Sequence, residues 1–223
     1  MESIVNDMSM IFRISTIQRV GQLLAGLWLF GASVALLVRA DLGLDPWDVL
    51  HQGLSERTGI SIGLVVVATS MMVLALWLPL RQQPGVGTLA NVVVVGLSLD
   101  WTLTFLPLPT GLAWRVAFLL TGIVANGVAT GLYICARLGP GPRDGLMTGL
   151  AARGLSVRVA RTAIEVTALL GGWLLGGTVG VGTLAYAVAI GPLVQVFIPL
   201  FTIRATQKEE NVMKLNVVKT SCS

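Results

Sequence analysis

The stretch Gly43-Leu44-Asp45-Pro46-Trp47-Asp48-Val49-Leu50 decides the fold, because it occurs twice in the chain. The second copy reads Gly139-Pro140-Gly141-Pro142-Arg143-Asp144-Gly145-Leu146, so both copies share the pattern Gly-x-x-Pro-x-Asp-x-Leu. Asp48 and Asp144 lie 96 positions apart, and each copy follows a long apolar run. Gly and Pro interrupt regular helices. The pattern therefore predicts the same interrupted, acidic element in each half of the chain.

The composition is that of an integral membrane protein. Hydrophobic residues make up 54% of the 223 residues, charged residues only 12%, and the mean hydropathy is +0.82. A soluble domain carries roughly 25% charged residues, so this chain cannot cover itself with a solvated surface. The net charge of +4 fits basic residues on the cytoplasmic side of a membrane and gives no reason to expect a nucleic-acid partner.

Six apolar runs are long enough to cross the hydrocarbon layer as helices. They cover residues 20–38, 62–80, 86–106, 112–133, 159–175 and 181–201. With a cytoplasmic N-terminus, all of the 15 Lys and Arg residues except Arg39, Arg57 and Arg115 lie on the inner side. The sequence thus predicts a multi-pass plasma-membrane protein with both termini cytoplasmic. Residues 1–19 form the N-terminal segment, and residues 205–223 form a mobile tail.

The similarity between the halves extends well beyond the first motif. Residues 85–90 and 180–185 both read Gly-Val-Gly-Thr-Leu-Ala, and Gly96 and Asp100 correspond to Gly191 and Gln195. This predicts a duplicated three-span unit, with repeat 1 in residues 20–111 and repeat 2 in residues 112–204. A unit with three spans ends on the opposite side of the membrane from where it began, so the second copy enters the membrane from that opposite side. The expected fold is all-α: a polytopic transmembrane helical bundle of about six spans, built as two inverted three-span repeats, each with a short re-entrant or interfacial helix.

Four segments carry a resemblance to a known family. They are GLDPWDVLHQGLSERTGISIG (43–63), PGVGTLANVVVVGLSLD (84–100), LGPGPRDGLMTGLA (138–151) and GGTVGVGTLAYAVAIGPLVQ (176–195). Over roughly residues 20–203 the chain resembles the YczE/YitT-like family of bacterial multipass membrane proteins, its YczE branch in particular. The resemblance implies a bacterial plasma membrane. It implies no specific activity, because the family has no general, well-established one.

Two interpretations of the repeated motif stay open. A helix of about ten residues from Pro46 would be ~15 Å long, half of what a span requires. It could lie at the interface with Asp48 as a capping carboxylate, or re-enter the membrane and converge with its counterpart. The second interpretation predicts a substrate site formed by Asp48, Asp144, Asp100, Gln195, Trp47 and Arg143. It also predicts hinge or packing positions at Gly43, Pro46, Gly139, Pro142, Gly96 and Gly191.

Two classes of function are compatible with these features. The first is a small secondary transporter or permease for an unknown small-molecule or lipid ligand, with its site between inverted repeats. The second is a non-transporting scaffold, assembly factor or accessory subunit that docks a partner through the basic segment 137–161. The sequence lacks a Gly-x-Ser-x-Gly elbow, a Walker motif and a metal-spaced His/Cys/Glu cluster. We therefore expect no enzyme activity, cofactor or metal, while a homodimer is compatible with a chain of this size.

Overall fold

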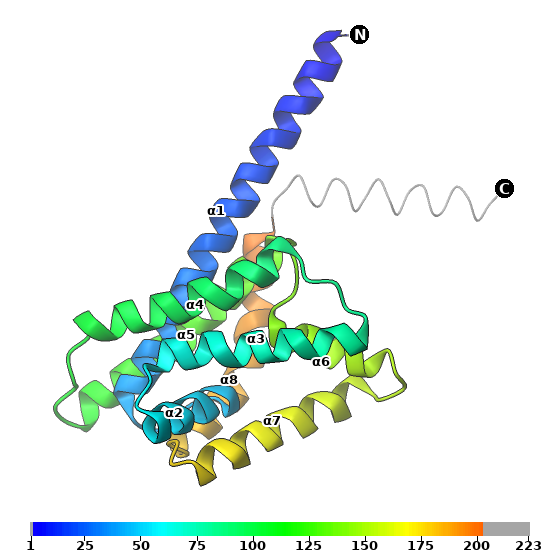
Figure 1. Cartoon of the computed structure of the whole chain (residues 1–223). Helices are drawn as coiled ribbons and strands as arrows, with labels where there is room; N and C mark the ends of the chain where they lie inside the picture. Colours follow the sequence, from blue (N-terminus) through cyan, green and yellow to red (C-terminus); the bar gives the residue numbers. More distant parts are fainter. Residues whose placement is uncertain (1, 203–223) are drawn as a thin grey trace.

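The computed structural model describes residues 2–202, with side chains from residue 16 onward, and this part of the chain is entirely α-helical and irregular. Its helices are α1 (Glu2–Ala40), α2 (Pro46–Thr58), α3 (Ile62–Leu80), α4 (Val86–Phe105), α5 (Leu112–Cys135), α6 (Pro142–Ala151), α7 (Val157–Leu174) and α8 (Val181–Phe201) (Figure 1). The all-α prediction is confirmed. The tail predicted at residues 205–223 lies outside the described residues.

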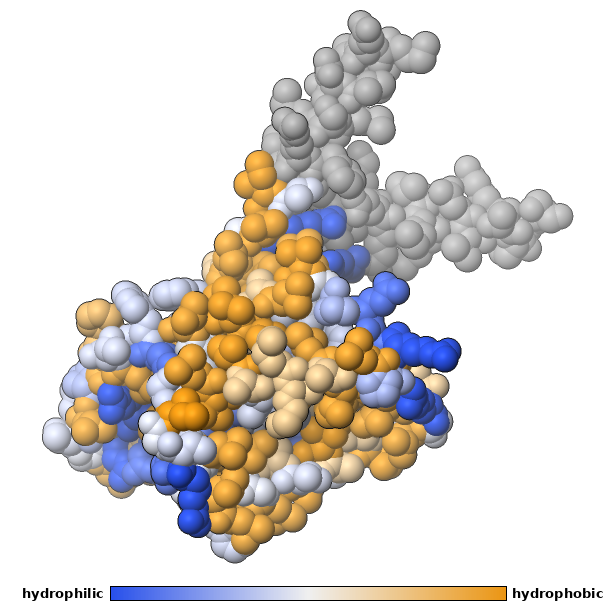
Figure 2. Space-filling view, in the orientation of Figure 1, coloured by the Kyte–Doolittle hydropathy of each residue, from blue (hydrophilic) through white to orange (hydrophobic). Residues whose placement is uncertain are grey.

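Five of the described helices are long and apolar enough to cross a membrane. They are α1 (from Thr16), α3, α4, α5 and α8. Large apolar side chains cover much of the visible surface, as expected for a protein solvated by lipid (Figure 2).

The sixth expected span, residues 159–175, forms α7 but does not belong to this set. Arg158, Arg161 and Glu165 all lie in its first half, which raises its charge above that of the five apolar helices. Five of the six predicted spans are therefore helices long and apolar enough to cross a membrane. The sixth, α7, is a helix with charged residues in its first half and does not meet that description.

Helices α1, α4, α5 and α8 form the centre of the bundle. Gly31 of α1 is so close to α4 that an added Cβ would meet the Val95 carbonyl oxygen at 2.4 Å. Ser98 donates a hydrogen bond of 2.6 Å to the Trp28 carbonyl on the same pair of helices. Arg39 near the end of α1 donates to the Leu103 carbonyl near the end of α4, at 2.7 Å, so these two helices run in the same direction. Helices α5 and α8 are also parallel, because Gly182 at the start of α8 lies against Leu119 and Cys135 at the end of α5 donates to the Ile198 carbonyl.

The two parallel pairs meet through α1 and α5, which run antiparallel. Gln22, near the start of the apolar part of α1 that begins at Thr16, donates to the Leu132 carbonyl near the end of α5, at 3.1 Å. Arg115 near the start of α5 donates to the Ala40 carbonyl at the end of α1, at 2.7 Å. The apolar part of α1 and helix α5 therefore run in opposite directions along their contact.

The short helices pack on a long helix from the other half of the chain. Helix α2 packs against α7, and α6 packs against α3. Trp77 of α3 is buried against Gly145 of α6, where an added Cβ would lie 1.9 Å from the indole ring, and its Nε1 donates to the Pro142 carbonyl at 3.1 Å. On the other side, Gly172 of α7 lies directly against the backbone of α2 at Val49. These contacts fix both short helices beside the central bundle.

Candidate functional site

The loop before each short helix contains a glycine whose conformation and surroundings exclude a side chain. Gly43 has φ +115° and Gly139 has φ +131°. A Cβ at Gly43 would meet the Gly180 nitrogen at 2.7 Å, and one at Gly139 would meet the Thr88 hydroxyl at 2.8 Å. A left-handed φ and a close backbone approach both require glycine. The predicted hinge or packing role of these glycines matches this geometry.

The loops before the short helices are attached to the bundle by a matched pair of backbone hydrogen bonds. Gly87, at the start of α4, donates to the Leu138 carbonyl at 2.8 Å. Gly182, at the start of α8, donates to the Leu42 carbonyl at 2.7 Å. Both glycines belong to the repeated Gly-Val-Gly-Thr-Leu-Ala segment, so equivalent residues make equivalent bonds across the two halves.

Helix α2 opens with a carboxylate cap. Asp45 is the N-cap residue, and its Oδ1 accepts a hydrogen bond of 2.6 Å from the Asp48 backbone nitrogen. Pro46 follows in the first turn, where its missing N–H costs nothing. The cap is therefore Asp45. Asp48, which one interpretation of the sequence made the cap, has its carboxylate directed to other partners.

Those partners form a buried polar cluster that joins the two halves of the chain, made up of Asp45, Trp47, Asp48, His51 and Arg143. Asp45, Asp48 and His51 are only 6%, 2% and 1% exposed. Arg143 of α6 reaches both carboxylates: its Nη1 lies 3.2 Å from Asp45 Oδ2, and its Nη2 lies 3.5 Å from Asp48 Oδ1. The His51 Nδ1 lies 3.1 Å from the same Asp48 oxygen.

Trp47 closes the cluster from the side. The Arg143 guanidinium carbon lies 5.1 Å from the centroid of the Trp47 ring, within the range of a cation–π contact. Trp47 and Arg143 occupy the same position in the two motif copies, so this contact joins equivalent residues of the two halves. The Trp47 Nε1–H is buried and has no hydrogen-bond acceptor among the described residues.

Burial sets the protonation of these groups. It raises the pKa of Asp45 to about 6, with a further upward contribution from Asp48 and a downward one from Arg143. Burial also raises the pKa of Asp48, against the pull of Arg143. It lowers the pKa of His51 to about 3, and Arg143 adds to that effect. His51 is therefore neutral near pH 7, and its Nδ1–H donates to the Asp48 carboxylate.

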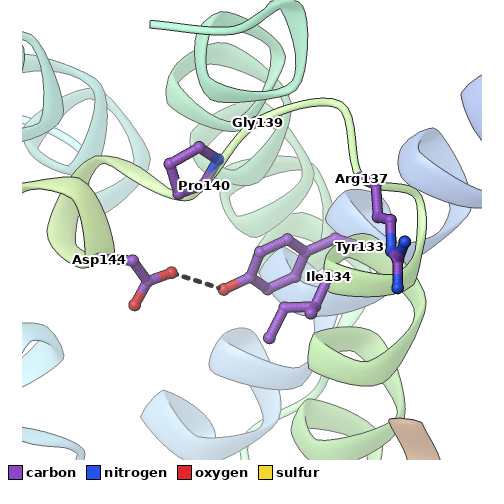
Figure 3. Close-up of a pocket in the computed structure, with 6 residues that line it drawn as sticks. All are labelled: Tyr133, Ile134, Arg137, Gly139, Pro140 and Asp144. Carbon is purple, nitrogen blue, oxygen red and sulfur yellow. Dashed lines mark hydrogen bonds between the residues drawn. The ribbon is translucent and has the colours of Figure 1, made fainter. Parts of the chain in front are cut away.

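A cavity lies beside Asp144, the residue that follows Arg143. It has a volume of about 450 Å³ and is lined by Tyr133, Ile134, Arg137, Gly139, Pro140 and Asp144. Figure 3 shows the Tyr133 hydroxyl directed at the Asp144 carboxylate, to which it donates a hydrogen bond of 3.1 Å. Asp144 is exposed, unlike its counterpart Asp48. A carboxylate, a phenol and an apolar wall thus border a space large enough for a small organic molecule.

The remaining predicted site residues lie elsewhere. Asp100, at the end of α4, accepts hydrogen bonds from the Ser61 hydroxyl at 2.6 Å and the Gly63 nitrogen at 2.7 Å, so it caps the start of α3. Gln195 is exposed on α8. The structure brings together Trp47, Asp48, Arg143 and Asp144, but it does not bring Asp100 or Gln195 to them.

The glycines one turn before these two residues differ in the same way. Gly96 lies so close to α3 that an added Cβ would meet the Gly63 carbonyl oxygen at 2.5 Å. Gly191 has open space where its side chain would be. Gly96 therefore lies at a close helix–helix contact, whereas Gly191 makes no such contact within the described part of the chain.

Comparison with known proteins shows where this chain belongs. The model of a family of unknown function, DUF6198, matches residues 17–199. The chain is a member of the DUF6198 family. That match spans both motif copies, α1 from Ile17 and most of α8, so the family includes the whole central bundle.

Relatives of this DUF6198 member occur in bacteria. An uncharacterized protein of Haemophilus influenzae is 43% identical over 177 residues, covering 79% of this chain and 81% of the relative. The uncharacterized membrane protein YczE of Bacillus subtilis is 31% identical over 179 residues, covering 76% and 80%. No solved structure matches. The expected resemblance to YczE is confirmed, and the DUF6198 chain is an integral membrane protein.

Sequence reasoning missed part of the site of this DUF6198 member. Asp45 and His51 stood in the quoted stretch, but nothing in their spacing showed that α2 would bury them. The chain has 2 tyrosines, Tyr133 and Tyr186, each in an apolar run. Tyr133 contacts Asp144, and Tyr186 lies within electrostatic reach of Asp45, Asp48 and Arg143. The rarity of tyrosine in these runs was the available signal.

Proposed function

We propose that this DUF6198 protein is a small secondary transporter or permease of the bacterial plasma membrane, with its site between the two short helices. One observation carries the proposal: Arg143 of the second half forms a buried ion pair with Asp45 and Asp48 of the first half, over the ring of Trp47. Charged groups inside a membrane protein are costly, and they mark ligand or ion pathways. The ligand is a small molecule or lipid whose identity stays open.

The proposal includes an architecture of two inverted three-span repeats. The antiparallel meeting of α1 and α5, the matched bonds from Gly87 and Gly182, and the contact of Trp47 with Arg143 all support a two-fold relation between the halves. In this arrangement α7 is the second span of the second repeat, between α5 and α8. Its 18 residues reach about 27 Å, and its charged residues lie toward one end.

Transport follows from two halves that move against each other around a fixed site. Short, broken helices at a repeat interface are where such transporters hold their substrates. Movement of α6 against α2 would open the cluster first toward one side and then toward the other. The sequence offers no nucleotide-binding loop, so the energy comes from gradients rather than from a nucleotide bound to this chain. Both termini are cytoplasmic in this proposal.

Two-sided labelling tests alternating access. Met147 is the second-half counterpart of His51 and is partly buried on α6. In a background with Cys135→Ser and Cys222→Ser, Met147→Cys should react with a membrane-impermeant maleimide added to either side of reconstituted vesicles. Leu155→Cys, in the exposed turn before α7, is the control and should react from one side only. Reaction of Met147→Cys from one side alone would remove the transport proposal.

A second candidate is a membrane scaffold, assembly factor or accessory subunit, and the surface of α7 and α8 favours it. Only 6% of the apolar window of α8 is buried, against 39–50% for the other four candidate spans. Arg153 and Arg158, beside this surface, are exposed. A stoichiometric partner that co-purifies with the chain and is lost on Arg153→Gln/Arg158→Gln would support this function. A second copy of the chain as that partner would indicate a homodimer.

A further inference from the structure

The buried cluster carries more negative than positive charge. Two carboxylates, Asp45 and Asp48, share one guanidinium, that of Arg143, and His51 is neutral. With both carboxylates ionised, the cluster has a net charge of −1 in a site from which water is largely excluded. An uncompensated buried charge costs several kcal/mol, so such a group binds a counter-ion or a proton.

Arg143 is the cation that acts on Asp45 and Asp48 among the residues that the structure describes. From α2 the cluster is faced by His51 and Trp47, from α6 by Arg143 and Asp144, from α5 by Tyr133 and from α8 by Tyr186. Asp144 is a third acid near the same guanidinium. The electrostatic environment of Asp45 and Asp48 therefore increases the demand for one positive charge.

We propose that the Asp45–Asp48 pair is the coupling-ion site and that its ion is the proton. This rests on the proposed transport function and supplies the gradient that drives it. A proton from water binds one carboxylate oxygen of the pair and leaves from it again, with no other bond formed or broken. Uptake brings the cluster to neutrality and weakens its hold on Arg143, so α6 can leave α2. Release restores the net −1 charge and draws Arg143 back.

The geometry favours a proton over a metal cation. Asp45 Oδ2 lies 3.2 Å from the Arg143 guanidinium, and Asp48 Oδ1 lies 3.5 Å from it. A metal ion bound between the two carboxylates would be repelled by this guanidinium. Hard cations such as Ca²⁺ and Mg²⁺ take about six or more oxygen ligands. No group of three or more His, Cys, Asp and Glu that could hold a metal occurs among the residues that the structure describes.

The raised pKa values of the two acids agree with this assignment, and they belong to the pair as a unit, since the groups interact strongly. The proton has a short route from water, because Asp144, which follows Arg143 directly, lines the cavity of about 450 Å³. Asp144 is exposed, so the residue next to Arg143 borders both this cavity and the surface.

Infrared spectroscopy of the purified full chain tests the proposal. The wild-type protein should show a protonated-carboxyl band that titrates in one step between about pH 5 and pH 8. Asp45→Asn and Asp48→Asn should change or abolish this step; Asn is also a good helix N-cap, so α2 can still form in Asp45→Asn. Glu56→Gln, an exposed carboxylate on the same helix, is the matched control and should leave the step unchanged.

A second variant protects the test against simple misfolding. Arg143→Gln removes the positive charge and should move the titration step upward by about one pH unit or more. No carboxyl titration in this range, a step that survives both Asn substitutions, or a step that responds to Na⁺ would overturn the proton site.

Vesicles separate this proposal from the transport function. A pH-sensitive dye inside proteoliposomes should report proton entry under an imposed membrane potential, and Asp45→Asn should lose it while Glu56→Gln keeps it. An infrared step without any proton movement would leave a proton-binding site in a protein that does not transport. Movement of a substrate driven by Na⁺ alone would keep transport and overturn the proton as the coupling ion.

Discussion

Helices α2 and α6 share the pattern Gly-x-x-Pro-x-Asp-x-Leu but differ in chemistry. Helix α2 begins at a side-chain cap, Asp45, and buries both Asp45 and Asp48. Helix α6 begins at Gly141 without a side-chain cap and exposes Asp144. At the variable position, α2 has Trp47 and α6 has Arg143, and the two side chains contact each other. Both copies keep the Gly and Pro that set the backbone conformation before the helix. The charged residues of the buried cluster, in contrast, differ between the two copies. One half supplies the acids and the other the cation.

The packing of the short helices shows the same division. On α6, Gly145 accommodates the large Trp77 of α3. At the equivalent contact, α2 carries Val49 and α7 carries Gly172. The large and small residues have changed sides between the halves. Each contact keeps one glycine, because the helices approach too closely for two side chains.

The clearest difference between the halves is the third helix. In the first half α3 packs along α4, with Gly63 against Gly96 and Asp100 capping the start of α3. In the second half the positions of Gly63 and Asp100 hold Arg158 and Gln195. Within residues 2–202, α7 and α8 are not among the well-packed helix pairs. A charged residue in place of the packing glycine explains why the second pair stays apart.

The largest effect is expected at the exchanged packing contact. Trp77→Ala should lower the free energy of unfolding by about 3–5 kcal/mol, because it leaves a cavity against Gly145. Gly145→Val should also be destabilising, since its side chain would overlap the Trp77 ring. The double variant Trp77→Ala/Gly145→Val places the large residue on the short helix and the small one on the long helix, as Val49 and Gly172 do in the other contact. It should therefore be more stable than the sum of the two single effects predicts, by about 1 kcal/mol or more. Denaturant unfolding in detergent measures this, and strict additivity would show that the contacts are not equivalent.

The second effect concerns the ion pair between the halves. Arg143→Gln leaves Asp45 and Asp48 without their cation and should cost about 3 kcal/mol at neutral pH. The loss should shrink below pH 6, as the acids become protonated. Arg161→Gln, which breaks the exposed pair with Glu165, is the control and should cost less than about 1 kcal/mol. Equal losses of unfolding free energy in the two variants would show that the buried ion pair stabilises the protein no more than an exposed one.

The third effect is a pair of opposite pH slopes. The variant His51→Gln keeps both acids. In the folded state the pKa of Asp45 is about 6, above its ordinary 3.8, so the folded state binds more protons than the unfolded state. The free energy of unfolding should therefore fall as the pH rises from 4 to 6. The variant Asp45→Asn/Asp48→Asn keeps the histidine. In the folded state the pKa of His51 is about 3, below its ordinary 6.5, so the folded state binds fewer protons than the unfolded state. The free energy of unfolding should therefore rise as the pH rises from 3 to 6.5. Each change should be on the order of 2 kcal/mol. Melting temperatures between pH 4 and 6.5 measure the slopes, and slopes of equal sign would contradict the assignment.

The smallest effect distinguishes the third helices. Asp100→Ala removes the carboxylate that caps α3 and should cost about 1 kcal/mol. Gln195→Ala changes the equivalent but exposed position of the second half and should stay within about 0.5 kcal/mol. Thermal unfolding of the two variants side by side makes the measurement. A larger loss in Gln195→Ala would mean that α7 contacts α8 after all.

Helical class, span boundaries and breaks could be predicted from the sequence, because apolar length and Gly-Pro punctuation determine them locally. The duplicated motif also pointed to Trp47, Asp48, Arg143 and Asp144, which the structure places near one another; their role as a substrate site stays a prediction. What the sequence could not supply was burial. Asp45 reads as a surface cap until α2 packs against α7, and Asp100 reads as a site residue until the start of α3 is placed beside it.

The most direct test of the account measures the distance between α2 and α6. Spin labels at Glu56→Cys and Thr148→Cys, both exposed, report the separation of the two short helices in the full chain in lipid. The account predicts two distance populations whose ratio shifts between pH 5 and pH 8, and loss of that shift in Asp45→Asn/Asp48→Asn. A single distance that is the same at both pH values would contradict it.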